Sequence, residues 1–420
     1  MKAMKTVSTI ALACALALGA MAGSPALAKK EPEAAAAPKP SAKVLPLAVE
    51  IQTALGKKDY ETAKAKLAAV EPLIATDDDK LFVGQFYLQT GQGVNDNAMI
   101  LHGIDLMIAS NKAAPSILPA LYANQGTLAY NAKDYAKANQ AMMQAFNLGS
   151  TDQNVVPVLF ETMRSQPLKA LQFLNEAIDK ANAAGKPVPN EWYGQGFNIA
   201  YQVKSSSPDY AAVRQQASGL IKKWVVAVPK GDVWHDAMIF FMEGAVGDND
   251  YKIDANRLLL ASGGLHNANE YLEYAELVYL RFPGEAKAVL DAGVKKGLVN
   301  FATNRNASEI NQIATTKMPA DKASLAASDK SARAAATGKA ALSTADAYLG
   351  YGEYAKALDL YNVALQKGGV DANVVNTRIG IALYKSGDAA GAKAAFAKVT
   401  GQRKDLADLW AILIDHPSQG

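Results

Sequence analysis

Small apolar residues recur along this chain at spacings that match one face of an α-helix. Ala357, Ala364 and Gly368 are separated by seven and then four residues. Residues seven apart share a helix face, where a small side chain lets a neighbouring helix approach closely. A closing glycine can adopt the left-handed conformation that ends a helix. The pattern predicts closely paired helices, and it occurs twice more, at Ala138, Ala145 and Gly149 and at Ala286, Gly293 and Gly297.

Pairs of an acidic residue and a tyrosine form a second repeating feature. In Asp59–Tyr60, Asp134–Tyr135 and Asp209–Tyr210 the tyrosines are 75 residues apart, as two helical hairpins of about 37 residues each would place them. Asp250–Tyr251 and Glu353–Tyr354 continue the feature. The sequence predicts about ten helical hairpins between Leu45 and Ile414, with further turns near residues 95–97, 165–167, 283–285, 319–321 and 387–389.

The unit from Ala341 to Gly368 carries the most complete pattern. A small residue at Ala345 and a tyrosine at Tyr348 precede the turn Gly352-Glu353-Tyr354, and Ala357, Tyr361 and Ala364 follow it. This unit resembles the tetratricopeptide repeat (TPR) family. The resemblance implies an all-α, right-handed solenoid of about ten antiparallel helical hairpins. It is weaker from Val155 to Thr316, where Ser205–Pro208 reads as a loop insertion, so we expect the middle of the solenoid to be irregular.

The first 28 residues have the features of a secretory signal peptide. Lys2 and Lys5 precede an uncharged apolar stretch from Ile10 to Ala22, and Ala26-Leu27-Ala28 supplies the small residues of a cleavage site. The stretch is shorter than the roughly 20 residues that span a bilayer. An earlier cleavage after Ala22, an uncleaved anchor and lipid attachment at Cys14 are the alternatives. We expect an exported protein, periplasmic or secreted.

The composition after the predicted signal peptide indicates how the rest of the chain is organised and which classes of function it supports. Residues 29–43 mix Pro, Ala and Lys without bulky apolar side chains, which predicts a disordered linker before a solenoid over residues 44–415. Cys14 is the single cysteine, so cleavage leaves no thiol, and loss of Lys2 and Lys5 lowers the net charge from +3 to +1. Such a charge gives no support for nucleic-acid binding, and no later apolar run is long enough for a transmembrane segment.

Local motifs for catalysis or metal binding are missing from the sequence. No two of the four histidines have the i, i+4 spacing of a local zinc motif. Gly338-Lys339 lacks the preceding glycine and the following Ser or Thr of a phosphate loop. Asp77-Asp78-Asp79 is interpreted as a helix start, where negative charge is favoured. We therefore predict no cofactor, no metal and no enzymatic activity; the histidines are His102, His235, His266 and His416.

The TPR resemblance implies a concave face, lined by the first helix of each hairpin, that binds a protein or peptide partner. Carried over to this sequence, it implies that the groove candidates are Tyr130, Asn131, Tyr193, Phe197, Tyr201, Tyr384 and Lys385, with Leu342, Asp346, Leu349 and Gly350 at the same positions of the penultimate unit. An exported scaffold or adaptor is the leading hypothesis. One alternative is a cell-wall glycan or small-molecule binder that uses Trp192, Tyr193 and Trp234 as stacking platforms. Another is an enzyme with a site between repeats.

Overall fold

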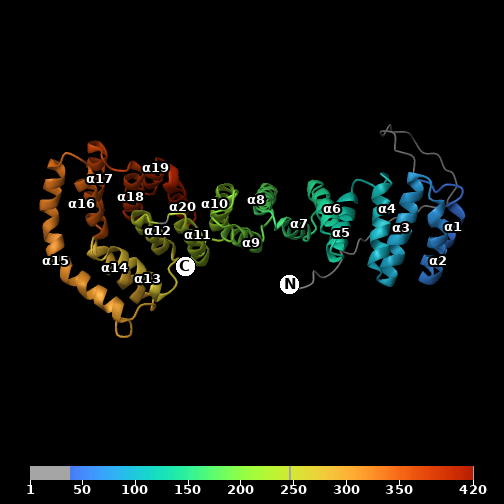
Figure 1. Ribbon diagram of the computed structural model, residues 1–420, viewed down its shortest axis with the longest axis horizontal. Helices are drawn as coiled ribbons and strands as arrows, with labels where there is room; N and C mark the ends of the chain where they lie inside the picture. Colours follow the sequence, from blue (N-terminus) through green and yellow to red (C-terminus); the bar gives the residue numbers. More distant parts are fainter. Residues whose placement is uncertain (1–37, 246, 420) are drawn as a thin grey trace, which may run out of the picture. The chain divides into compact units, whose positions relative to one another are not determined.

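The structure is a computed structural model that describes residues 38–245 and 247–419 (Figure 1). The predicted signal peptide and residues 29–37 of the predicted linker lie outside the described residues. The chain divides into two compact units, residues 1–186 (unit 1) and residues 187–420 (unit 2), and each is described by itself. Across the described ranges the secondary structure is helical, apart from one isolated bridge between Lys230 and Gln419. None of the helices described is long and apolar enough to cross a membrane.

Unit 1 consists of four consecutive helical hairpins. Its helices are α1 (Leu45–Gly56), α2 (Tyr60–Val70), α3 (Asp77–Val94), α4 (Asn97–Ala109), α5 (Leu118–Asn131), α6 (Tyr135–Asn147), α7 (Val155–Met163) and α8 (Pro167–Ala183). A short 3-10 turn over Glu71–Leu73 follows α2.

Unit 2 begins with three more hairpins, continues through one long helix, and ends with two hairpins and a final helix. Its helices are α9 (Asn190–Tyr201), α10 (Tyr210–Ala227), α11 (Gly231–Glu243), α12 (Asn249–Ser262), α13 (Ala268–Val278), α14 (Pro283–Lys295), α15 (Arg305–Ala334), α16 (Lys339–Gly350), α17 (Tyr354–Lys367), α18 (Ala372–Lys385), α19 (Ala389–Phe396) and α20 (Lys404–Asp415), with a 3-10 turn, η2 (Gly401–Arg403), before α20. The prediction of an all-α repeat of helical hairpins is confirmed.

In four of the five acidic–tyrosine pairs the acidic residue is the N-cap of a helix. The exception is Asp250–Tyr251, which lies in the first turn of α12 after the N-cap Asp248. Asp59 and Asp134 are the N-caps of α2 and α6, and each carboxylate accepts a backbone amide hydrogen bond from the first turn. Such caps satisfy amides that the helix itself leaves unpaired. In the equivalent turn before α17, Gly352 has a φ of +75°, a left-handed conformation that glycine adopts without steric cost. The recurring sequence feature therefore encodes the turn between the two helices of a hairpin.

Small residues lie at the helix crossings, as their spacing predicts. Ala138, Ala145, Ala357 and Ala364 are fully buried. One close crossing joins α3 and α4, where a Cβ atom added at Gly103 would lie 2.6 Å from the carbonyl oxygen of Gly84. No side chain fits in that space, so the two backbones pack directly against each other.

The aspartates at residues 77–79 start α3, as predicted. Thr76 and Asp79 form a capping box, in which each side chain binds the backbone amide of the other residue. Residues 38–43, the last part of the predicted linker, approach the same helix end: the backbone amide of Ser41 donates to Asp79 at 2.7 Å.

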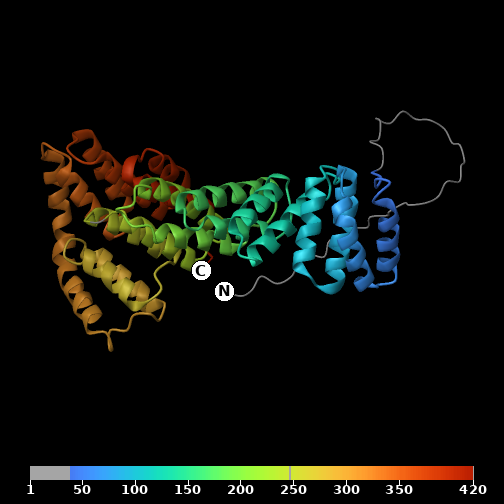
Figure 2. The same cartoon turned by 45° about the vertical axis from the view of Figure 1, so that its right-hand side comes forward.

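The predicted turn at residues 319–321 is wrong. Helix α15 runs without interruption from Arg305 to Ala334 and contains Pro319 in its interior; Figures 1 and 2 both show it as one long helix. Proline removes one amide donor and leaves a carbonyl group one turn earlier without its usual partner. The helix surface before Pro319 is largely exposed, so water can satisfy that carbonyl and the helix continues.

Unit 2 is closed by contacts of its C-terminal elements with α10 and with the turn after it. On α10, Lys222 forms ion pairs at 2.7 Å with Asp405 and with Asp408 of α20. The backbone amide of Gln419 donates to the carbonyl oxygen of Pro229 at 2.7 Å. An open solenoid would restrict each repeat to its neighbours, whereas these contacts return the C-terminal helices to α10 and to the turn before α11.

Candidate binding grooves

The sequence-derived groove candidates of unit 1 lie at the C-terminal end of α5. Tyr130 is half-buried and packs edge-on against Tyr135, with ring centroids 5.4 Å apart. Asn131 is exposed. Neither residue lines the cavity between α5 and α6 that is described below.

The candidates on α9 of unit 2 do not share one surface. Tyr193 is 1% exposed, so it lies in the core and offers a ligand almost no surface. Phe197 is half-buried and stacks on Tyr201, which is 45% exposed. Trp234, one of the stacking platforms of the glycan hypothesis, is fully buried. Tyr193 and Trp234 are therefore unavailable as platforms for a sugar ring.

Lys385 is the sequence-derived candidate that lines a groove, together with Leu349 and Gly350 from the penultimate unit. Its neighbour Tyr384 instead packs edge-on against Trp410, with ring centroids 5.2 Å apart. We call this cavity of about 360 Å³ the α14/α16 groove. Residues from α12 to α18 contribute to it, and its volume lies within the range of small ligand sites.

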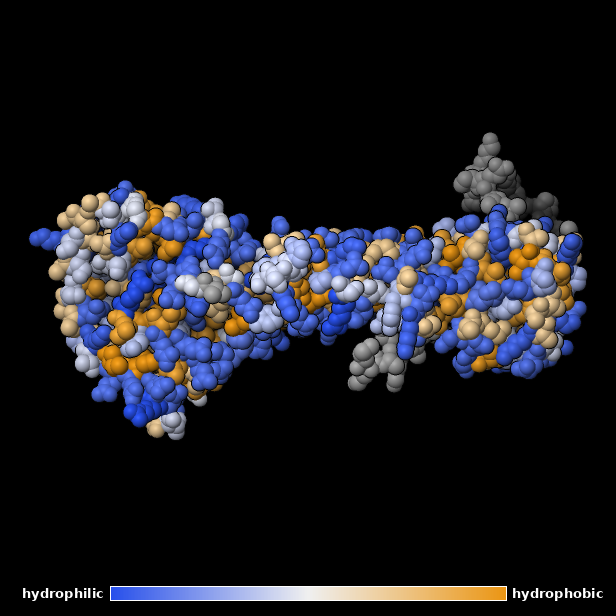
Figure 3. All heavy atoms as spheres, viewed as in Figure 1, coloured by the Kyte–Doolittle hydropathy of each residue, from blue (hydrophilic) through white to orange (hydrophobic). Residues whose placement is uncertain are grey.

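One wall of the α14/α16 groove is apolar and its rim carries two tyrosines. Val289 of α14 and Met318 of α15 belong to the apolar wall, and Tyr351 and Tyr354 lie at the turn between α16 and α17. The Tyr351 hydroxyl donates to Asp321 at 2.7 Å, which holds its ring in place. In Figure 3, hydrophobic side chains gather among polar ones on the face of unit 2 where α13 and α14 lie.

The carboxylate in the groove wall is already fully partnered. Glu285 accepts two hydrogen bonds from Arg257 at 2.7 Å each and one from the Tyr274 hydroxyl at 2.6 Å. Burial alone would raise the pKa of Glu285, but the charge and hydrogen bonds of Arg257 outweigh it and hold that pKa at about 2. Glu285 is therefore ionised and engaged, and it is not a free acid or base.

Glu285 belongs to a buried ion cluster that joins helices distant in sequence. Asp254 of α12 accepts hydrogen bonds from Arg257 at 2.8 Å, from Arg378 of α18 at 3.3 Å and from Arg403 of η2 at 2.7 Å. The cluster comprises three arginines and three carboxylates, each at most 6% exposed: Arg257, Arg378, Arg403, Asp254, Glu285 and Asp346.

Asp346 shows why a repeat position can mislead. The TPR resemblance places it in the groove, but it is fully buried. It accepts hydrogen bonds from Arg378 and from the Tyr361 hydroxyl at 2.8 Å each. The side chain stabilises the contact between α16 and α18 instead of facing a ligand.

Lys385 is the cation of the groove without a fixed partner. Among the described residues, no carboxylate oxygen lies within ion-pair distance of its ammonium group, whereas Lys322 pairs with Glu353 at 3.6 Å. The side chain reaches the surface, yet partial removal from water lowers the pKa of Lys385. A bound carboxylate would stabilise the charged form of Lys385 and so offset the loss of contact with water.

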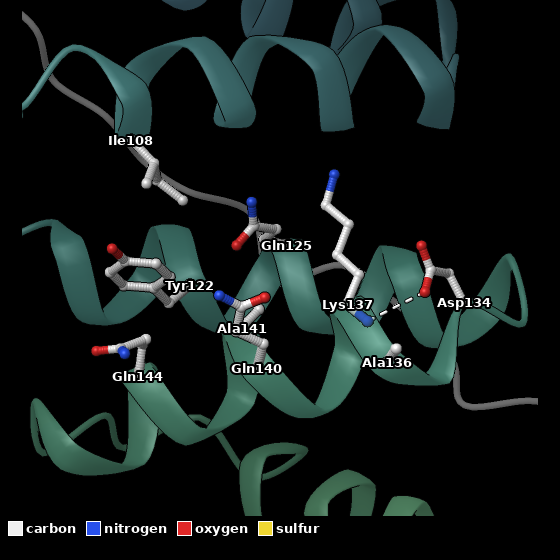
Figure 4. A pocket seen from close by; sticks show the side chains of 9 residues that line it. All are labelled: Ile108, Tyr122, Gln125, Asp134, Ala136, Lys137, Gln140, Ala141 and Gln144. Atoms are coloured by element: carbon white, nitrogen blue, oxygen red, sulfur yellow. Dashed lines mark hydrogen bonds between the residues drawn. The ribbon is translucent and has the colours of Figure 1, made fainter.

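A second cavity, the α5/α6 groove of about 560 Å³, lies in unit 1 (Figure 4). Tyr122 and Gln125 of α5 face Gln140 and Gln144 of α6 across it. Lys137, also on its lining, pairs with Asp105 at 2.5 Å. Most of its lining is uncharged; its charged residues are Lys137 and Asp134, whose carboxylate caps α6.

The sequence analysis missed one cluster of chemically active side chains. His235, His266 and Glu270 place one ligand atom each within 4.8 Å of the others. A search for two histidines on one helix turn could not find it, because the histidines come from α11 and from the loop before α13. The mixed pairs Asp232/His235 and His266/Glu270, three and four residues apart, were the available signal.

Comparisons with known proteins identify no family for this chain. No family model matches the sequence, and no curated protein matches it. Solved structures similar to this one include Naa15/Naa10 bound to HypK-THB (12% identity, TM-score 0.23, covering 88% of this chain and 70% of that chain). Others are yeast Tom70 (10% identity, TM-score 0.22, covering 89% and 95%) and the APC/C hetero-tetramer Cut9–Hcn1 (12% identity, TM-score 0.17, covering 89% and 97%).

TM-scores this low carry no argument about function, and the class of the protein rests on its own hairpins. Paired helices, small residues at their crossings and capped turns before the second helix define an all-α helical-repeat protein of TPR-like construction.

Proposed function

We propose that this protein is a binding scaffold that holds an acidic and apolar peptide segment of a partner protein in the α14/α16 groove. The observation that carries the proposal is the position of Lys385. Its unpaired ammonium group lies beside an apolar wall and a tyrosine rim. A ligand carboxylate would pair with Lys385 while apolar side chains cover the half-buried Leu260 and Met318.

The groove is prepared for binding by the residues beneath it. The buried ion cluster fixes α12, α14, α16 and α18 relative to one another, so the groove needs little ordering when a ligand arrives. A site held in its bound geometry loses less conformational entropy on association. Tyrosine is a common anchor at protein interfaces because it combines a large apolar face with a hydroxyl group.

Charge supports an acidic ligand over a basic one. The negative charge of Glu285 is compensated by Arg257, and the Tyr274 hydroxyl occupies a further acceptor position, so the carboxylate offers little to a ligand cation. Lys385 remains as the unpaired cation of the groove, since Lys322 pairs with Glu353. Complementary charge adds to specificity and speeds association even where it adds little affinity.

The side chains of the groove support binding more than catalysis. A general base needs a free position within hydrogen-bond reach of its substrate. Glu285 makes three strong hydrogen bonds within the protein, and the Tyr351 hydroxyl is bound to Asp321. We therefore propose that the protein is not an enzyme at this site.

The proposal includes export to the periplasm or the extracellular space. Its support is the sequence of the first 28 residues, with two lysines, an apolar stretch and Ala26-Leu27-Ala28. N-terminal sequencing of the protein from the producing cells should begin at Lys29, or at Gly23 for the earlier cleavage. Recovery of Met1 on the exported protein would contradict cleavage.

Selection from a displayed library of random peptides tests the binding function. We expect enrichment of peptides that combine an acidic residue with apolar neighbours. Fluorescence anisotropy should then show that Lys385→Glu weakens binding of the best peptide by at least about tenfold, since it replaces an attraction with a repulsion.

Lys398→Glu is the matched control. It makes the same charge change at an exposed position of the same unit, outside the groove. An equal loss of peptide affinity in both variants would mean that the net charge of the protein, and not a contact with Lys385, causes the weaker binding. Absence of any enriched peptide would contradict peptide binding.

A further inference from the structure

The second candidate site of unit 2 is the cluster of His235, His266 and Glu270, away from the α14/α16 groove. From its geometry we infer that these three side chains bind a divalent transition-metal ion of the Zn²⁺ type, with Asp232 within reach as a fourth ligand. The inference is independent of the proposed peptide binding.

The distances within the cluster suit a small four-coordinate ion. His235 Nε2 lies 3.4 Å from Glu270 Oε1, and His266 Nε2 lies 3.3 Å from Asp232 Oδ1. Ligands about 2.0–2.1 Å from a tetrahedral zinc are themselves about 3.4 Å apart. The imidazole rings of His235 and His266 are 4.5 Å apart between centroids, so a modest contraction brings the ligand atoms around one ion.

Glycines at the contact between α11 and the loop after α12 bring the two histidines together. A Cβ at Gly231 would lie 2.7 Å from the carbonyl oxygen of Gly263, and a Cβ at Gly264 would lie 3.2 Å from the backbone nitrogen of His235. Larger residues at these positions would separate α11 from the loop. This close approach carries His235 to within contact distance of His266, which is 31 residues later in the chain.

Two further bonds orient the ligands. Glu270 Oε2 accepts the backbone amide of His266 at 2.7 Å, and Oε1 accepts the side-chain amide of Asn267 at 2.5 Å. His266 Nε2 is shielded from solvent and makes no well-formed hydrogen bond. Polar atoms shielded from water normally have a partner, and a metal ion would be one for this nitrogen.

Helix capping accounts for part of this arrangement but not for all of it. Asn267 is the N-cap of α13, and Glu270 in the first turn accepts the backbone amide of His266, the residue before the cap. That role explains the carboxylate. It does not explain why two imidazoles from separate elements converge on it.

The donor set selects the chemical class of the ion. Imidazole nitrogens with one or two carboxylates suit zinc and its first-row neighbours. Calcium and magnesium prefer oxygen ligands alone. The side chains of His235, Glu270 and His266 are 24%, 22% and 31% exposed, so the cluster lies near the surface although His266 Nε2 itself is shielded.

Calorimetric titration with zinc chloride tests the inference on the full chain without a histidine tag. A Cys14→Ser background removes the single thiol, which would otherwise compete for zinc. We expect one equivalent to bind, with no competition from calcium. His235→Ala and His266→Ala should each weaken binding by at least about tenfold, since even loss of a residue that only orients a ligand costs that much. His102→Ala and His416→Ala should not weaken it.

Glu270→Gln separates metal binding from helix capping. The amide oxygen of glutamine can still accept the backbone amide of His266, so the thermal stability should remain close to that of the parent, whereas zinc affinity should fall. The inference is overturned if no equivalent of zinc binds, or if binding survives the combined His235→Ala/His266→Ala change.

Discussion

Replacing Asp254 by asparagine removes the central charge of the buried ion cluster while keeping the size of the side chain. Asp254 is fully buried and accepts hydrogen bonds from Arg257, Arg378 and Arg403. With Asp254 made neutral, the three arginines face two buried carboxylates, Glu285 and Asp346. The partly exposed Asp250, which pairs with Arg378 at 2.9 Å, offsets only part of the excess positive charge. Removing one partner of a buried ion pair costs about 3–5 kcal/mol. We expect a loss of that size for Asp254→Asn.

Tryptophan fluorescence provides an assay restricted to unit 2. All four tryptophans of the chain, Trp192, Trp224, Trp234 and Trp410, lie in that unit. With a urea dependence of about 3 kcal/mol per molar, the expected loss lowers the unfolding midpoint by about 1 M or more. Hydrogen exchange should also become faster in α18 and α20, because Arg378 and Arg403 connect these C-terminal elements to α12.

Lys287→Ala is the matched control for Asp254→Asn. Lys287 pairs with Asp291 on the surface of α14 at 2.8 Å, with side chains 33% and 51% exposed. Pairs of this kind contribute about 0.5 kcal/mol or less. If Asp254→Asn lowers the midpoint no more than Lys287→Ala does, the buried cluster does not hold unit 2 together and our explanation of its closure is wrong.

Three other substitutions test separate parts of the structure. Gly103→Ala should destabilise unit 1 by about 1–3 kcal/mol through overpacking against Gly84. Circular dichroism should detect this destabilisation, whereas tryptophan fluorescence should not. The control Gly56→Ala, with open space around the added Cβ, should cause no loss of stability. The pKa of Glu285 is lowered from 4.5 to about 2, so the stability that ionised Glu285 contributes is present above pH 4.5 and lost as the pH falls toward 2. Glu285→Gln should therefore flatten the dependence of the unfolding free energy on pH, measured by urea titrations read by fluorescence. An unchanged pH dependence would refute this prediction. Ala357→Leu should lower the fluorescence-detected midpoint because Ala357 is fully buried, whereas Ala355→Leu, at an exposed position, should not.

Features set by neighbouring residues were predictable from the sequence. The acidic residues before Tyr60 and Tyr135 cap helices, and capping depends on a few consecutive residues. Ala357 and Ala364 are buried where their spacing places them. The hairpins between these points follow from the same local rules.

Features set by distant residues were not predictable in this way. Asp254 and Arg403 bond to each other across 149 positions, and nothing in a repeat pattern indicates that pairing. The same closure explains Asp346, which occupies a groove position of the repeat but is recruited by Arg378. The turn predicted at Pro319 was wrong because the free-energy cost of a proline inside a helix depends on whether water reaches the freed carbonyl group. That access is a property of the folded surface.

The candidate site was predictable only in part. Lys385, Leu349 and Gly350 line the α14/α16 groove, but Tyr193 is in the core and Tyr201 lies elsewhere on unit 2. Helical position alone does not distinguish a groove face from a core face when helices are covered on both sides. The histidine cluster was missed for a related reason, since a close contact of α11 with the loop before α13 creates it.

Photocrosslinking from single positions tests the central claim most directly. A photoreactive phenylalanine analogue at Tyr354, on the rim of the α14/α16 groove, should crosslink to the peptide selected for binding, and excess unlabelled peptide should abolish the product. The same analogue at Tyr201, which is 45% exposed and outside the groove, should give no specific product. Crosslinking at Tyr201 with none at Tyr354 would contradict our placement of the binding site.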